Sequence, residues 1–293
     1  MKDHSGQTTQ KQFIIAIGIS TFIFVGEFLG GFWTGSLALL SDSAHVFLDI
    51  FALVISYISL RISTLPADDR HTYGWHRLEV FAGLTNGLSL FAVTISILYE
   101  AWHRIRTPVT IHSTEMLLIA TIGLVANLLT ARLFKNHHKH DINVHSAFLH
   151  IVGDALSSVG VIIGGGMILF TGWAIIDPIV SILISIFLFI GSWRVVRSSI
   201  HILVEGTPEG ISLSDVARAI TDIDGVRDVH DLHIWSICSG YPALSVHVCF
   251  TFDDAVSERM SQIKRMLHDR FGIEHTTIQV ETENCGQGSK IAL

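Results

Sequence analysis

Six long apolar segments dominate the sequence and limit the folds that it can adopt. Each has about the 20 residues that a helix needs to cross a bilayer. Hydrophobic residues make up 49% of the 293-residue chain, charged residues only 15%, and the mean hydropathy is +0.50. A soluble protein with six such segments in a row would have little polar surface, so we expect a six-helix transmembrane bundle. The expected spans are 12–33, 36–62, 79–103, 113–134, 143–171 and 177–200.

The basic residues predict how this bundle is oriented. An even number of spans puts both termini on one side of the membrane, and cytoplasmic loops carry an excess of Lys and Arg. Ten basic residues lie in the N-terminal tail, in the loops after spans two and four, and at the end of span six. The opposite loops carry two, Arg104 and Arg106. We therefore expect both termini in the cytosol.

The chain after the sixth span has the pattern of a soluble domain. Helical spacing in 211–223 and 255–272, and alternation in 226–237, 243–252 and 275–282, predict the order α-β-β-α-β. This order indicates a small cytosolic α+β domain, ferredoxin-like, with a short antiparallel sheet. The expected boundaries are 1–11 for an N-terminal tail, 12–205 for the transmembrane domain, 206–285 for the α+β domain and 286–293 for a disordered tail.

The charge of this domain limits its partners. Residues 205–293 carry 7 Lys and Arg against 14 Asp and Glu, which accounts for the whole net charge of −7. Phosphate would be repelled, so nucleic acid is not expected as a partner. The three cysteines all lie here, their number is odd, and none forms a C-x-x-C pair, which favours reduced thiols over a disulfide framework.

Two spans contain the same motif, a histidine followed four residues later by an aspartate. The second span has His45 and Asp49, and the fifth has His150 and Asp154. Residues i and i+4 lie on one face of a helix, so each motif presents an imidazole and a carboxylate in one direction. A charge at the bilayer centre costs at least about 2.5–3.5 kcal/mol on insertion scales, so two matched motifs are hard to explain by packing. Facing each other, they offer the four ligands of a tetrahedral Zn²⁺ site; a structural hydrogen bond and a metal-free proton relay are the alternatives.

Four further polar residues interrupt the spans. Asp42 precedes His45 by three residues and shares its helix face. Two functional roles are open for it, a residue of the ion path or an auxiliary metal ligand. The alternative is a residue that caps the helix or faces water near the helix start. Glu27, Asn86 and Asn127 are single polar residues in three other spans. Hydrogen bonds between helices are the expected role of such residues.

Taken together, these features resemble the cation diffusion facilitator family, and most closely its zinc-transporting branch. The resemblance rests on six spans, H-x-x-x-D in spans two and five, "YGWHRLEVFAGL" entering span three, "DPIVSILIS" opening span six and "HDLHIW" in a C-terminal α+β domain. It covers about residues 12 to 285. Any one of these pieces alone would be weak, but the paired motif in this context is highly specific.

The resemblance implies a homodimeric antiporter that exports Zn²⁺ from the cytosol in exchange for H⁺ by alternating access. It assigns the transport site to His45, Asp49, His150 and Asp154. Ligation needs neutral imidazole and ionised carboxylate, so protons and metal compete for the same atoms. The reference pKa of histidine, near 6.5, places this competition close to physiological pH. The sequence has no Walker motif, which argues against ATP as the energy source.

The resemblance also points to cytosolic metal sites. In the α+β domain, the positions that match the family's sites are His230, His247 and Glu281, with His268, His275 and Cys285 as further candidates. The loop after span two offers Asp68, Asp69, His71 and His76, although Trp75 stands where the family has a ligand. The loop after span four offers His137, His138 and His140 for gathering metal. Arg77 is expected to pair with an acid after span six, such as Glu205 or Glu209.

Other functions fit the sequence less well. The first alternative is a transporter that exports another divalent cation, such as Cd²⁺, Co²⁺, Fe²⁺ or Mn²⁺. A membrane metalloenzyme is disfavoured because the sequence has no H-E-x-x-H motif and four protein ligands leave no position for a catalytic water. A membrane-anchored metal sensor would not need charges inside the bilayer. Short loops and a short tail favour a bacterial inner membrane, with a eukaryotic organelle membrane as the alternative.

Overall fold

The computed structural model describes residues 4–63, 65–134, 142–251 and 256–281. The chain divides into two compact units. One comprises residues 1–55 and 85–195, and the other comprises 56–84 and 196–293. The first unit is made of helices, and the second contains the helix ends that flank the loop of residues 65–76 together with the C-terminal α+β domain.

Six long helices fold where the apolar segments predict them. Five of them are long and apolar enough to cross a membrane over their described residues. The sixth, α2, is 27 residues long and carries Asp42, His45 and Asp49 among its apolar residues. The prediction of six spanning helices is confirmed. Their bounds are α1 His4–Thr34, α2 Leu37–Ser63, α3 Arg77–Arg106, α4 Ser113–Phe134, α5 Ile142–Thr171 and α6 Ile176–Leu203.

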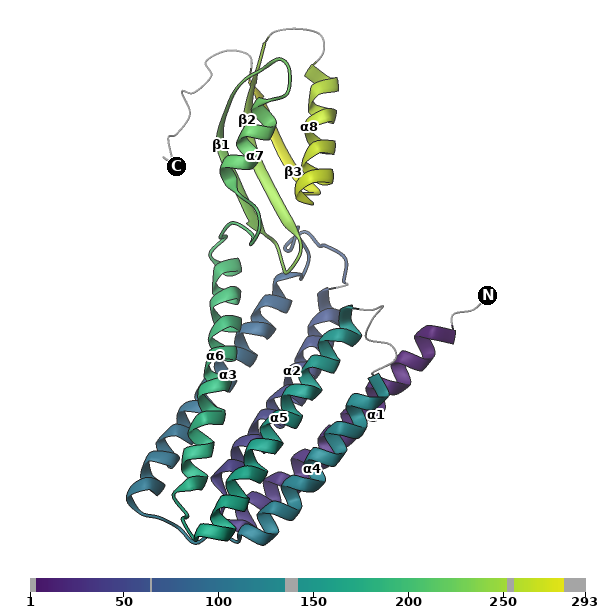
Figure 1. Ribbon diagram of the computed structural model, residues 1–293. Helices are drawn as coiled ribbons and strands as arrows, with labels where there is room; N and C mark the ends of the chain where they lie inside the picture. Colours follow the sequence, from purple (N-terminus) through teal and green to yellow (C-terminus); the bar gives the residue numbers. More distant parts are fainter. Residues whose placement is uncertain (1–3, 64, 135–141, 252–255, 282–293) are drawn as a thin grey trace. The chain divides into compact units, whose positions relative to one another are not determined.

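The helices of the first unit pack through one buried face each and expose apolar side chains on the other. Figure 1 shows α1 alongside α4, and side-chain contacts join α2 to α5. Small and medium residues fill the interior, among them Ala38, Leu39, Met116, Ala120 and Val161. Large apolar side chains such as Phe22, Leu29 and Phe187 are exposed. This is the reverse of a soluble protein's surface, as expected for helices that face lipid.

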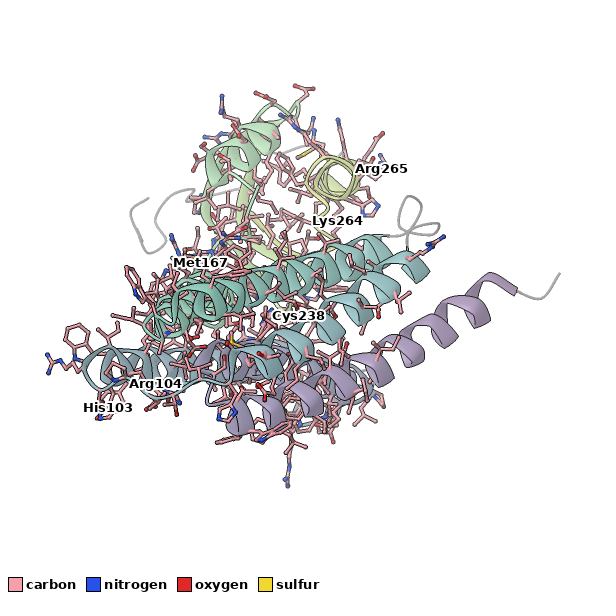
Figure 2. The ribbon with its side chains drawn as sticks, turned by 60° about the horizontal axis from the view of Figure 1, so that its bottom comes forward. His103, Arg104, Met167, Cys238, Lys264 and Arg265 are labelled. Atoms are coloured by element: carbon pink, nitrogen blue, oxygen red, sulfur yellow. The ribbon has the colours of Figure 1, made fainter. Side chains whose placement is uncertain are left out.

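A buried carboxylate from α6 holds the start of α2. Asp177 is fully buried and accepts hydrogen bonds from the Ser36 hydroxyl (2.6 Å), the Leu37 N–H (2.7 Å) and the Ala38 N–H (3.2 Å). These N–H groups belong to the first turn of α2 and have no partner within the helix. The guanidinium of Arg104, labelled in Figure 2, lies 4.0 Å from Asp177 Oδ2 and donates to the Gly35 carbonyl. Asp177 therefore caps α2 from another helix, 140 residues away.

The C-terminal domain has the predicted element order. It comprises α7 Leu213–Thr221, β1 Val226–Ser236, β2 Pro242–Phe250, α8 Val256–Phe271 and β3 His275–Glu281. Ser212 caps α7 by accepting from the Asp215 N–H, and Gly272, with φ of 67°, ends α8 as its sequence predicts. Buried residues from α7, β1, β2 and α8, such as Val216, Leu232, Val246 and Leu267, form one core, and the partly buried Ile278 of β3 packs against it.

The sheet of this domain is mixed, so the expectation of an antiparallel sheet is wrong for its last strand. β1 and β2 pair antiparallel, whereas β3 pairs parallel to β2, in the order β1-β2-β3. The chain between β2 and β3 crosses the sheet through α8, and such a helical crossover returns the chain in the same direction. Cys249 on β2 is disulfide-bonded and Cys238 is free. Reduced thiols are therefore also a wrong expectation for Cys249.

Replacing Asp177 with alanine should destabilise the bundle. The change leaves one buried hydroxyl and two helix N–H groups without an acceptor, at a cost on the order of 2–4 kcal/mol. We expect a lower thermal unfolding midpoint for the detergent-solubilised protein. Glu100→Gln, which removes only an exposed partner of Arg104, is the matched control and should change the midpoint little. Equal midpoints for the two variants would contradict the capping role.

Candidate metal centres

The first cluster of ligand-type side chains joins α2 to α5. His45 Nδ1 lies 3.5 Å from Asp49 Oδ2 on the same helix, and His45 Nε2 lies 3.3 Å from Asp154 Oδ1 on α5. One ligand atom from each of the three residues lies within 4.8 Å of the others. Asp154 is buried, and His45 and Asp49 are largely covered. The structure thus brings together residues of the two H-x-x-x-D motifs.

His150 completes this set in the sequence, but its side chain lies outside the described residues. Its backbone is part of α5, four residues before Asp154. The helical spacing of i and i+4 places both residues on one helix face. Its role in the site remains a prediction from that spacing.

Asp42 connects the same two helices one turn away from His45. Its carboxylate accepts hydrogen bonds from the hydroxyls of Ser157 (2.5 Å) and Ser158 (3.3 Å) on α5. With an exposed fraction of 2%, Asp42 does not face water in this state. These bonds set the register of α2 against α5, and that register determines which residues of the two motifs meet. A role in the ion path stays a prediction.

The imidazole of His45 stands between two carboxylates. Because each ring nitrogen faces a different aspartate, a doubly protonated ring can satisfy both. A metal ion needs a deprotonated nitrogen instead, so it must replace a proton here. The 3.3 Å between His45 Nε2 and Asp154 Oδ1 is close to the ligand separation of about 3.4 Å in a tetrahedral zinc site.

The second cluster lies on the sheet of the C-terminal domain. His230 and His247 are direct partners in the β1–β2 register, and Glu281 lies at the end of β3. Glu281 contacts both rings, through Oε1 to His247 Nδ1 (2.9 Å) and through Oε2 to His230 Nε2 (3.2 Å). Their ligand atoms lie within 4.8 Å of one another. The sheet therefore assembles the three residues that matched the family's sites best.

Three polar residues around this cluster were missed from the sequence. Asp228 contacts His230 at 3.1 Å, and Gln279 donates to Glu281 at 3.0 Å. The i, i+2 alternation of β1 and β3 could have found both of them. Asp231 could not be found this way, because it lies at an irregularity of β1 with φ of 50°. That backbone turn places its carboxylate 3.5 Å from His247 and 3.0 Å from His233.

The other candidates in this domain lie away from the cluster. His268, on the exposed side of α8, lies 3.8 Å from Glu274. His275 begins β3 and packs its ring against Tyr73, and the six residue-to-residue steps from it to Glu281 span about 20 Å of extended strand. Cys285 lies outside the described residues, as do His137, His138 and His140 of the loop after α4.

The loop between α2 and α3 brings together only part of its predicted set. Asp68 accepts from the Arg70 and His71 N–H groups, and its carboxylate lies 3.0 Å from the His71 ring. The backbone N–H of Arg70, with that of His71, holds the pKa of Asp68 below its usual range. His71 stacks on Trp75, whereas His76 stacks on Tyr241. Asp68 and His71 thus form a pair, and His76 is directed elsewhere.

Arg77 makes the ion pair that the sequence predicts. Its Nη2 lies 3.0 Å from Glu205 Oε1, and both residues belong to the second unit. Glu205 has a φ of 61°, which turns the chain just after α6. The two side chains are about half exposed, so the pair fixes geometry more than it adds stability.

Comparison with known protein families identifies the class. The family model described as the cation efflux transmembrane domain matches residues 13–204, and the cation efflux protein, cytoplasmic domain, matches residues 208–283. The chain belongs to the cation efflux family, and is a multi-span membrane transporter rather than an enzyme.

Curated relatives match along most of their length. The metal cation efflux system protein CzcD of Cupriavidus metallidurans is 40% identical over 97% of this chain and 90% of its own. The cadmium, cobalt and zinc/H(+)-K(+) antiporter of Bacillus subtilis is 39% identical, over 96% and 92%. The zinc transporter ZitB of Escherichia coli is 37% identical, over 94% and 88%. A solved metal-bound C-terminal domain of CzcD is 40% identical, covers 24% of this chain and 99% of that one, and has a TM-score of 0.23.

His247→Ala should reduce the metal content of the purified full-length protein. Loss of one of three ligands weakens a site strongly, so we expect about one Zn²⁺ fewer per chain in equilibrium dialysis at low metal concentration. Glu274→Gln changes an exposed glutamate just before β3 and should leave the metal content unchanged. An unaltered metal content in His247→Ala would contradict a metal site at this cluster.

Proposed function

We propose that this protein exports Zn²⁺ from the cytosol in exchange for protons, through a site formed by His45, Asp49, His150 and Asp154. The observation that carries the proposal is the convergence of His45, Asp49 and Asp154 from α2 and α5 inside an apolar bundle. The names of the relatives, which include zinc transporters and a zinc/H(+)-K(+) antiporter, support the same substrate class.

The ligand types favour zinc. Two imidazole nitrogens and two carboxylate oxygens form a tetrahedral set that suits Zn²⁺, and nitrogen ligands bind it better than the harder cations Mg²⁺ or Mn²⁺. Transport also requires release. Protonation of His45 and of the carboxylates displaces the metal, since the same atoms hold either the ion or the proton. An inward proton gradient can therefore drive metal outward when the site is open to each side in turn.

The orientation follows from the distribution of charge. With the basic residues on the cytosolic side, both termini and the C-terminal domain lie in the cytosol of a bacterium, and the bundle lies in the inner membrane. The family model for the C-terminal domain, described as cytoplasmic, supports this placement. We also propose that the protein works as a homodimer and that the His230, His247 and Glu281 cluster binds Zn²⁺ as a regulatory ion.

A second substrate range has specific support. The Bacillus subtilis relative is named for cadmium and cobalt as well as zinc. Cobalt and cadmium accept the same nitrogen and oxygen ligands, so the site can carry them too. A membrane-anchored sensor has no comparable support.

Metal flux into proteoliposomes tests the transport proposal directly. With an imposed pH gradient, vesicles that contain the native protein should accumulate Zn²⁺. Asp49→Ala should reduce this flux at least about tenfold, because the substitution removes a metal ligand. Glu100→Gln, on an exposed part of α3, is the control and should transport normally. A folded native protein that transports none of Zn²⁺, Cd²⁺, Co²⁺, Fe²⁺ or Mn²⁺ would refute the transport proposal and favour the membrane-anchored metal sensor instead.

His45→Asp should change the selectivity of the site. Replacing a nitrogen ligand with a carboxylate makes the set harder, which favours Mn²⁺ relative to Zn²⁺. We expect the ratio of Mn²⁺ to Zn²⁺ flux to rise several-fold in competition assays. A constant ratio, with flux retained, would show that His45 does not select the metal.

A further inference from the structure

A buried glutamate on α1 has no role in the metal site described above. Glu27 is 1% exposed, and neither of its carboxyl oxygens has a hydrogen-bond partner within the described residues. The expectation of an interhelical hydrogen bond is therefore wrong for Glu27. A carboxylate in such surroundings is strongly destabilised, because it has lost water and gained no donor.

The packing of α1 against α4 makes room for this carboxyl group. Gly123 of α4 faces it, and a Cβ at that position would lie 2.5 Å from Glu27 Oε1. Any other residue at 123 would therefore displace the carboxyl group. Between Met116 and Ala131, α4 has no charged residue that could neutralise it. The glycine thus leaves space for an acid at a place where nothing on α4 compensates its charge.

Glu27 lies beside the helix that carries Asp42, His45 and Asp49. Phe24, one turn before Glu27 on α1, has its ring 5.3 Å from the ring of Phe47 on α2, two residues after His45. Glu27 lies about 10 Å from the end of α1, and His45 about 12 Å from the start of α2, at 1.5 Å per residue. Only Gly35 and Ser36 separate these two helix ends, so Glu27 and His45 lie at similar depth. Neighbouring negative charges make an ionised Glu27 still less stable.

We propose that Glu27 is a second proton site of the exchange, separate from the metal ligands. Without metal, Glu27 holds a proton as a neutral carboxylic acid. When a divalent cation enters the nearby site, its positive charge stabilises the carboxylate, the O–H bond breaks, and the proton leaves to water. When the metal departs, the carboxylate binds a proton again. Glu27 thus adds a proton to the exchange without contacting the metal, and this inference rests on the proposed metal/proton antiport.

Proton release upon metal binding tests the assignment. Full-length protein in lightly buffered detergent, with a pH indicator, is titrated with Zn²⁺, and the protons released per ion bound are counted. Glu27→Gln keeps the shape of the neutral acid but cannot ionise, so it should release about one proton fewer per Zn²⁺ and should bind Zn²⁺ more weakly at high pH, where the native carboxylate is ionised in the metal-bound state. Glu115→Gln, which alters a half-exposed acid on α4, should match the native count.

Glu27→Asp tests whether the lower proton count of Glu27→Gln has a merely structural cause. It restores an ionisable group on a shorter side chain, so its proton count should return toward the native value. An unchanged count in Glu27→Gln would overturn the proposal, as would Zn²⁺ affinities of Glu27→Gln and the native protein that stay equal at every pH. If the native protein shows no flux driven by a pH gradient, the antiport proposal itself fails, and this outcome is measured separately in proteoliposomes.

Discussion

The contact between His45 on α2 and Asp154 on α5 places a titratable, metal-binding group inside an apolar bundle. Burying such groups is costly unless they are paired or bind an ion, so the surrounding helices must hold them at a fixed distance. Several polar contacts among the described residues of the bundle serve this purpose. Asp42 bonds to serines of α5 next to the site, and Asp177 caps the helix that carries His45 and Asp49.

These polar contacts explain how helices without a hydrophobic driving force keep one register. Lipid is as apolar as the helix surfaces, so association depends on close packing and on specific hydrogen bonds. A slip of one residue on α2 would move His45 by about 100° around the helix axis and away from Asp154. The Asp177 cap opposes such a slip because its partners are the first N–H groups of α2. A transporter that alternates between two states must rearrange or carry along these contacts.

In the C-terminal domain, a sheet rather than a helix pair holds the metal-binding side chains at fixed distances. Strand pairing holds His230 opposite His247, and the parallel third strand adds Glu281 beside them. The crossover through α8 is therefore what completes this cluster, since an antiparallel third strand would run the other way and move Glu281 to the opposite end. Asp231, in its left-handed conformation, adds a carboxylate that regular strand geometry would point to the other face.

The sequence by itself determined the features that depend on local periodicity. Span lengths, the i, i+4 pairing of each H-x-x-x-D motif, the alternation of His230 and His247 on their strands and the cap of α7 follow from neighbours within a few residues. Only the tertiary structure decided which distant groups meet. It paired Asp177 with a helix start 140 residues away, gave β3 its parallel direction, separated His268 and His275 from the metal cluster and gave Glu27 no donor among the described residues. The physical reason is that such contacts depend on how whole helices and strands pack, and one-dimensional spacing carries no information about the partner across the interface.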